Sequence, residues 1–211
     1  MKSKLRFIDC GANIGQSIDW FLNNFGEEYL TQIDSFEANP ELIGILNQKI
    51  SFIDENIKSH HVAVSTNTQS KKFYLQTWGA RTGSSLIKGK ESTDENSFIE
   101  IDTINLNEWL QNNCDFENEY VILKLDIEGT EYEVVESLIE TGMCNNISAL
   151  LVEWTPDVKF SRNKDMVASI DSRKVIVKRA SEEFSLVLDW HAPDDCVVPL
   201  REALENNVEK T

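Results

Sequence analysis

The sequence predicts an α/β fold: one domain over residues 1–211, with a mostly parallel, twisted sheet and helices on both of its faces. Short apolar runs alternate along the chain with segments whose apolar residues recur at helical spacing. Strands that are joined through helices pair in parallel, and the helices cover both faces. In such a sheet, ligands bind at the carboxyl ends of the strands, where the strand order reverses.

The first elements follow this alternation. Residues 5–10 form an apolar run that ends at a glycine, and we expect a strand there. Residues 16–24 have the spacing of an amphipathic helix, and residues 32–37 form the next strand. Pro40 fits the first position of a second helix, where no partner is needed for its missing N–H. Residues 60–65 are expected as a third strand.

The alternation continues around one soft stretch. Residues 88–97 are rich in Lys, Glu, Ser, Asp and Asn, which predicts a surface loop. In chain order, the remaining elements are expected as a hairpin or extra strands at 71–76 and 97–103, a short helix at 105–111, a strand at 121–126, a helix at 130–140, a strand at 147–154, a helix at 165–184, a strand at 185–190, and a polar helix or tail from 201.

The charge of the chain argues against nucleic acid and membrane surfaces as partners. Its 36 acidic and 20 basic residues give a formal net charge of −16, so phosphate backbones and anionic lipids repel it. No apolar run approaches the ~20 residues of a membrane-spanning helix, and no signal peptide is visible. The four cysteines form no CxxC pair, so we expect free thiols in the reducing cytoplasm.

A turn with two glycines follows the first expected strand. Gly11 and Gly15 let the backbone turn tightly and let a ligand approach it closely. Asn13 stands where a dinucleotide-binding turn has its middle glycine, and Asp9 before the turn would repel a pyrophosphate. An acid at this position suits the ammonium group of S-adenosylmethionine. The alternative is an ordinary strand, turn and helix in which Asn13 is a cap.

An acidic residue also ends the second expected strand. Glu37 lies about 20 residues past Gly15, the spacing at which an acid accepts hydrogen bonds from a ribose diol in nucleotide-binding folds. The alternative is an acid that caps the helix starting at Pro40. Its position after the glycine turn favours the ribose.

More acids follow two later strands. Asp126 and Glu128 come after the apolar run at 121–126, and Glu153 lies near the end of the run at 147–154. Carboxylates at the tips of neighbouring strands meet at one edge of a parallel sheet. Helix caps and salt bridges with Lys124 are the alternative.

Six segments, in this order along the chain, resemble the FkbM family of methyltransferases. They are residues 9–15, 36–40, 62–65, 82–86, 104–110 and 124–131. The segment 82–86 is similar to the family's Ser-Ser-Leu loop, whereas 104–110 carries Asn107 where the family more usually has Asp. The resemblance covers residues 5–155, and we expect residues 156–211 to complete the sheet and the substrate side.

This resemblance implies a Rossmann-like class I methyltransferase fold, S-adenosylmethionine as methyl donor, and transfer to a hydroxyl of a sugar, glycan or glycosylated small molecule. It also implies that Asp126 and Glu128 face the reacting centre. Family members have more chain before the first strand, so we expect a domain excised from a larger protein or one without a lid. The resemblance places Asp9, Gly11, Ala12, Asn13, Gly15 and Gln16 at the methionine end of the donor, Glu37 at its ribose, Val62 and Ala63 at its adenine, and Ser84 and Ser85 in a substrate loop.

Two routes are open for activating the acceptor hydroxyl. Asp126 takes its proton, directly or through water. Alternatively, Asp126, Glu128 and Glu153 bind a divalent cation that lowers the pKa of the hydroxyl. The three histidines are further candidate bases, with His191 foremost because it lies among aromatic and acidic residues; the others are His60 and His61.

Three other functions remain as alternatives. A nicotinamide-dependent oxidoreductase is disfavoured by Asp9 and Asn13. A catalytically degenerate fold that serves as a binding module in a larger synthase is disfavoured by the retention of Asp9, Glu37 and Asp126. The third alternative is methylation of a protein or of a nucleic acid. The acidic charge of the chain disfavours nucleic acid as the acceptor.

Overall fold

The computed structural model describes residues 4–26, 29–53, 55–77, 79 and 82–208, and it confirms the α/β fold. The main sheet has six strands in the order β3-β2-β1-β7-β8-β9, and every neighbouring pair is parallel. Its strands are β1 (Lys4–Cys10), β2 (Leu30–Phe36), β3 (Ile57–His60), β7 (Glu119–Leu125), β8 (Ala149–Val152) and β9 (Val187–Asp189). The strand order reverses between β1 and β7, so the ligand crevice of such a sheet is expected at their carboxyl ends.

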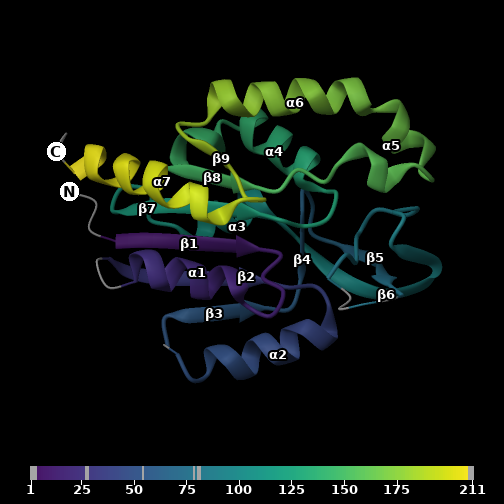
Figure 1. Cartoon of the computed structure of the whole chain (residues 1–211), viewed down its shortest axis with the longest axis horizontal. Helices are drawn as coiled ribbons and strands as arrows, with labels where there is room; N and C mark the ends of the chain where they lie inside the picture. The colour runs from purple at the N-terminus through teal and green to yellow at the C-terminus, as the bar shows by residue number, and fades with distance from the viewer. Residues whose placement is uncertain (1–3, 27–28, 54, 78, 80–81, 209–211) are drawn as a thin grey trace.

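Helices cover both faces of this sheet (Figure 1). Side chains along β1 alternate between the faces, as the strand pleat requires: Phe7 packs with one apolar cluster and Ile8 with the other. The Phe7 cluster includes residues of α1 (Gln16–Phe25), α2 (Pro40–Ile50) and α7 (Pro193–Val208). The Ile8 cluster includes residues of α3 (Leu106–Asn113), α4 (Glu131–Glu140) and α6 (Ile170–Glu183).

A second, smaller sheet lies beside the first in the order β4-β6-β5. It contains β4 (Ala63–Ser65), β5 (Ser70–Gln76) and β6 (Thr93–Asn105), and β5 pairs antiparallel with β6. The expected hairpin is therefore confirmed. In Figure 1 the arrow of β1 points toward the side of the molecule where β5 and β6 lie, so this sheet borders the carboxyl ends of the main strands.

The expected third strand at 60–65 was wrong in part: its residues belong to the end of β3 and to β4, because the chain changes sheets there. His60 is the last residue of β3 and pairs with Phe36, the last residue of β2. Beyond this point β2 offers no further partner, and the chain leaves the main sheet to begin β4 at Ala63. The expected surface loop at 88–97 was also wrong in part, since β6 begins at Thr93.

The carboxyl-terminal helices differ in their bounds from those expected. The helix expected at 165–184 is two helices, α5 (Lys164–Ala168) and α6, separated at Ser169. The Ser169 N–H donates to carbonyls of α5, and its hydroxyl accepts a hydrogen bond from Arg173 at 3.1 Å. The last helix begins at Pro193, not at 201. Short 3₁₀ turns, η1 (Met143–Asn146) and η2 (Asp157–Phe160), flank β8. Within the described residues, no helix has the length and hydrophobicity to cross a bilayer.

Candidate functional site

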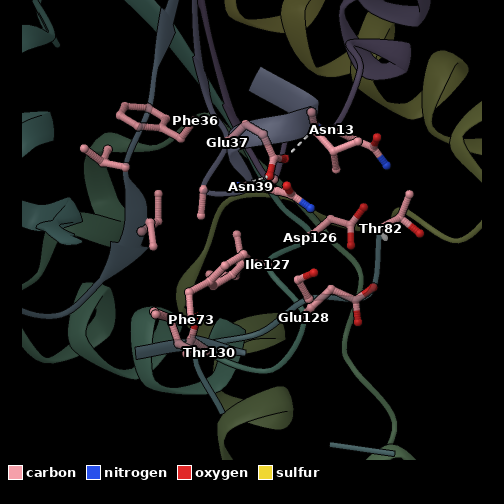
Figure 2. Close-up of a pocket in the computed structure, with 18 of the residues that line it drawn as sticks. Asn13, Phe36, Glu37, Asn39, Phe73, Thr82, Asp126, Ile127, Glu128 and Thr130 are labelled. Atoms are coloured by element: carbon pink, nitrogen blue, oxygen red, sulfur yellow. Dashed lines mark hydrogen bonds between the residues drawn. The ribbon is translucent and has the colours of Figure 1, made fainter. Parts of the chain in front are cut away.

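A cavity of about 270 Å³ opens where the strand order reverses. Residues that follow β1, β2, β7 and β8 line it, together with residues of the smaller sheet and its loop. In Figure 2, Phe36 and Phe73 lie toward one end of the group of lining side chains, and Thr82, Asp126 and Glu128 lie toward the other. The cavity thus has an apolar end and an acidic end.

The turn after β1 is held close to the tips of its two neighbouring strands. The N–H groups of Gly11 and Ala12 both donate to the carbonyl oxygen of Phe36, at 2.9 and 3.0 Å. Gly11 has φ +83°, and a Cβ at this residue would lie 1.8 Å from the carbonyl oxygen of Asp126. Only glycine fits between these two strand ends. Gly11 and Asn13 line the cavity, as expected from the sequence.

Glu37 lies at the middle of the cavity wall, with its carboxylate held by two backbone N–H groups (Figure 2). Its Oε2 accepts from Asn13 N at 2.8 Å, and its Oε1 accepts from Asn39 N at 2.7 Å. Burial raises the pKa of Glu37, and the two N–H groups act against that shift. Each oxygen retains acceptor capacity, so the side chain can receive two hydroxyl groups of a diol.

The apolar end of the cavity, called the apolar slot below, is lined by residues of both sheets. Val62 and Ala63 line it where the chain passes from the main sheet to the smaller one, and their contact with adenine stays a prediction. Phe73 of β5 also lines it and was not singled out from the sequence. A signal existed, because Phe73 lies within the strand expected at 71–76, but nothing in the sequence predicts which face that strand turns toward the cavity.

Asp126, Glu128 and Glu153 meet at the acidic end, as expected. Burial raises the pKa of Asp126; Lys124 lowers it, while Glu128 and Asp9 raise it further. Burial likewise raises the pKa of Glu153, and the charge of Asp126 adds to this effect. Carboxylates whose pKa values lie above the ordinary range are better proton acceptors at neutral pH than exposed ones.

Glu128 is held in an unusual backbone conformation by the loop from the smaller sheet. Its φ is +61°, which a residue with a side chain rarely adopts. The hydroxyl of Ser85 donates to the Glu128 carbonyl at 2.6 Å, and the ammonium of buried Lys90 binds its carboxylate. Ser84 lines the cavity, whereas Ser85 lies behind it and positions Glu128.

Asp9, which the sequence places at the methionine end of the donor, is not among the residues that line the cavity. Its side chain is fully buried, with Oδ1 3.0 Å from Lys124 Nζ and Oδ2 accepting from the Ser17 hydroxyl at 2.5 Å. Lys124 also donates to the Gly11 carbonyl at 2.9 Å. Burial lowers the pKa of Lys124, but the charges of Asp9 and Asp126, together with the hydrogen bond to Asp9 and the charge of Cys10, raise it by more. Asp9 therefore acts on the turn through Lys124.

Glu131 is a buried acid of this site to which the sequence analysis assigned no role. Its carboxylate accepts hydrogen bonds from Ile127 N at 2.9 Å and from Gly129 N at 2.9 Å, and from the hydroxyl of Thr155. Burial raises its pKa to about 7. These bonds fix the loop that carries Asp126 and Glu128. The signal was present: Glu131 lies on the same helical face as the inward apolar residues of the expected helix.

The other residues named from the sequence lie outside the cavity lining. Ala12 and Gly15 are buried behind the turn, and Gln16 is exposed at the start of α1. His191 is half exposed and lies 3.4 Å from Glu153 Oε1 and 3.1 Å from Asp189 Oδ1. It can therefore influence Glu153 from outside the cavity. The remaining histidines make other contacts: His60 binds Asp34 at 2.9 Å, and His61 lies 3.2 Å from the carbonyl of Ala38.

The acidic end does not have the arrangement of a metal site. Among the residues that the structure describes, no three His, Cys, Asp or Glu side chains are grouped so as to hold an ion. The carboxylate of Glu128 is engaged by Lys90 and lies 3.6 Å from Lys159 Nζ, and Asp126 lies 3.7 Å from Lys124 Nζ. The expected alternative of a divalent cation on Asp126, Glu128 and Glu153 is thus not supported, because these acids are not grouped as metal ligands and Lys90 already engages Glu128.

Two comparisons with known proteins gave a match. The family model of the methyltransferase FkbM domain matches residues 9–179. A crystal structure of a methyltransferase FkbM from Methylobacillus flagellatus KT is similar, with 16% sequence identity and a TM-score of 0.43. The match covers 70% of this chain and 31% of that chain, so the chain spans about a third of the length of that protein. No curated protein matches the sequence significantly.

Proposed function

This chain belongs to the FkbM methyltransferase family, and on that premise we propose that it is an S-adenosylmethionine-dependent O-methyltransferase. The proposed acceptor is a hydroxyl of a sugar, a glycan or a glycosylated small molecule. The observation that carries the proposal is the position of Glu37, a buried carboxylate with free acceptor capacity in a cavity lined also by Gly11 and Asp126. A nucleoside with a free ribose diol fits this arrangement.

The residues of the cavity suit the donor at both ends. The apolar slot around Val62 and Phe73 suits the adenine ring, and Glu37 suits the ribose. The acids beyond it favour the positive charge of a sulfonium nucleoside over a pyrophosphate. When bound, S-adenosylmethionine supplies the methyl group and leaves as S-adenosylhomocysteine.

The chain's own residues then position the acceptor and remove its proton. The turn at Gly11 and the carboxylate of Glu37 fix the donor, and its alignment with an acceptor hydroxyl at the acidic end is worth effective molarities of roughly 10⁵ M or more. Asp126 is the proposed general base, because it lines the cavity and its pKa is raised by burial. Glu153 and Glu128 complete the acidic end, and His191 contacts Glu153 from outside.

The charge and the cysteines support a small acceptor and a cytoplasmic location. A formal net charge of −16 disfavours nucleic acid and membrane surfaces as partners. The four cysteines are free thiols, as expected in a reducing compartment. The single-domain organisation over residues 1–211, within a larger protein or alone, is part of the same proposal.

Calorimetric titration tests the donor assignment directly. We expect S-adenosylhomocysteine to bind with micromolar affinity and NAD to give no heat of binding. Transfer of a labelled methyl group from S-adenosylmethionine to a panel of saccharides then tests the acceptor. Donor binding without turnover on any acceptor would favour a binding module over an enzyme, and transfer to RNA or protein but to no saccharide would overturn the acceptor class.

A further inference from the structure

A second cavity, of about 550 Å³, lies directly beside the acidic end of the first. The two cavities share Thr82 and Glu128 in their walls. A molecule in the second cavity therefore lies next to the acids that are proposed to act on the acceptor hydroxyl. This position is that of an acceptor, not of the nucleoside.

The charge of this second cavity is opposite to that of the chain. Lys90, Lys159 and Arg162 line it together with two carboxylates, Glu91 and Glu128. Its local formal charge is thus positive, in a chain whose acids outnumber its bases 36 to 20. Asp126 and Glu153 line only the first cavity.

The ammonium of Lys90 and the carboxylate of Glu128 already bind each other. The Lys90 side chain is 1% exposed, and its ammonium donates to the Gly83 carbonyl at 2.8 Å and binds the Glu128 carboxylate. Burial lowers the pKa of Lys90, and the charge of Glu128 acts against that shift. The pair neutralises Glu128 toward the second cavity, so this acid offers little repulsion to an anion there.

The other two cations are available to a ligand. Arg162 is exposed, and within the described part of the chain its guanidinium has no hydrogen bond or ion pair. Lys159 is 37% exposed, and its ion pair with Glu128, at 3.6 Å, is longer than a hydrogen bond, so its ammonium can also reach a ligand. The remaining carboxylate, Glu91, already accepts the Ser161 hydroxyl at 2.6 Å. A planar guanidinium and a nearby ammonium are the groups that bind a carboxylate or a phosphate.

From this juxtaposition we propose that the acceptor is an anionic saccharide, whose carboxylate or phosphate is bound by Arg162 and Lys159 while its hydroxyl faces Asp126. This inference rests on the proposed function and narrows its substrate class. Arg162 and Lys159 are then specificity-determining residues, and the neutral part of the sugar lies near Thr82.

Binding of model sugars to the protein saturated with S-adenosylhomocysteine tests this inference. The probes are glucuronate, glucose 6-phosphate and the neutral methyl glucoside, titrated by calorimetry or by NMR of the Arg162 guanidinium signal. We expect at least one charged sugar to bind roughly tenfold more tightly than the neutral glucoside, as for one charged hydrogen-bonded contact. The carboxylate and phosphate probes distinguish the two kinds of anion.

Variants identify the residues responsible. Arg162→Gln is decisive because it leaves the Lys90–Glu128 pair in place, and it should remove the preference for the charged sugar. The matched control, Lys178→Gln, changes an exposed lysine of α6 and should leave the preference unaltered. Equal binding of charged and neutral sugars, no binding of any, or a preference that survives Arg162→Gln would each overturn the inference. Binding of S-adenosylhomocysteine is measured in the same samples, so a failure of the donor assignment is seen separately.

Discussion

The carboxylate of Glu37 accepts a hydrogen bond from the backbone N–H of Asn13 at 2.8 Å, which joins the tip of β2 to the turn after β1. This contact makes Glu37 both a part of the cavity wall and a support for the turn. In the proposed function, the same side chain therefore supports the folded turn and binds the donor.

Glu37→Gln should weaken the binding of S-adenosylhomocysteine by at least about tenfold, because a charged acceptor of hydrogen bonds from the ribose is lost. Calorimetry measures the dissociation constant. The matched control is Glu140→Gln, which changes an exposed acid at the end of α4 and should leave the affinity unchanged. An unaltered affinity in the Glu37 variant would remove the main support for the nucleoside site.

Asp9→Ala should lower the free energy of unfolding by about 3–5 kcal/mol, because it leaves the charge of buried Lys124 without its closest charged partner. The double variant Asp9→Ala/Lys124→Met should recover part of this loss, since no unpaired charge remains. Urea unfolding measures both. A loss below about 1 kcal/mol in the single variant would show that the pair is not the support of the turn described above.

Asp126→Asn should lower kcat about 100-fold or more while the donor still binds, as expected when a general base is removed. In the unaltered protein, burial raises the pKa of Asp126, so kcat/KM should fall with decreasing pH sooner than it would with an exposed aspartate. This acidic limb should be absent in Asp126→Asn. Glu153→Gln is the comparison, because the pKa of Glu153 is raised too; loss of the limb there instead would assign the base to Glu153.

Glu131→Gln tests the buried acid behind the loop. The folded pKa of Glu131 is about 7, above the 4.5 of an exposed glutamate, so the folded protein binds this proton more tightly than the unfolded chain. Its contribution to stability is present below pH 4.5 and is lost as the pH rises to about 7, a change of roughly 3 kcal/mol. Relative to the unaltered protein, Glu131→Gln should gain about that amount between these pH values. Parallel pH profiles of unfolding would contradict this.

Gly11→Ala should prevent folding or cost several kcal/mol, because its Cβ would lie 1.8 Å from the Asp126 carbonyl and its φ of +83° is strained for alanine. Gly44→Ala is the control. Gly44 lies in α2 with open space around it, so the same change should stabilise the helix by about 1 kcal/mol. Thermal unfolding of the two variants shows whether the loss of stability comes from the position of Gly11 or from replacing a glycine with alanine in general.

The sequence was sufficient for five of the six strands of the main sheet, because these are short apolar runs that end at glycines or acids. The carboxyl ends of parallel strands lie at one edge of the sheet. The sequence alone therefore predicted that Glu37, Asp126 and Glu153 lie close together. The sequence was insufficient at 60–65, where the strand ends for lack of a partner. Where a neighbouring strand ends is a property of the tertiary structure, so no local sequence pattern predicts it.

Two residues illustrate the other limits. Asp9 precedes the turn, so the sequence suggests a contact with a ligand. In the structure its side chain is buried against Lys124, which belongs to a strand far along the chain, and no local pattern predicts that pairing. Lys90 lies in a stretch whose composition predicts a solvated loop, and yet its side chain is buried against Glu128. Composition averages over a segment and cannot identify the one charged residue that folds inward.

The cavity is built by two separate structures: the tips of the six-stranded sheet, and the smaller sheet with the loop that carries Thr82 and Ser84. Glu128 is a contact between them, because Ser85 and Lys90 of the loop hold it, whereas the nucleoside side around Gly11 and Glu37 belongs to the main sheet. Exchanging the loop between Thr82 and Ser92 for that of another family member is expected to redirect the enzyme to a new acceptor while the nucleoside-binding edge is inherited unaltered.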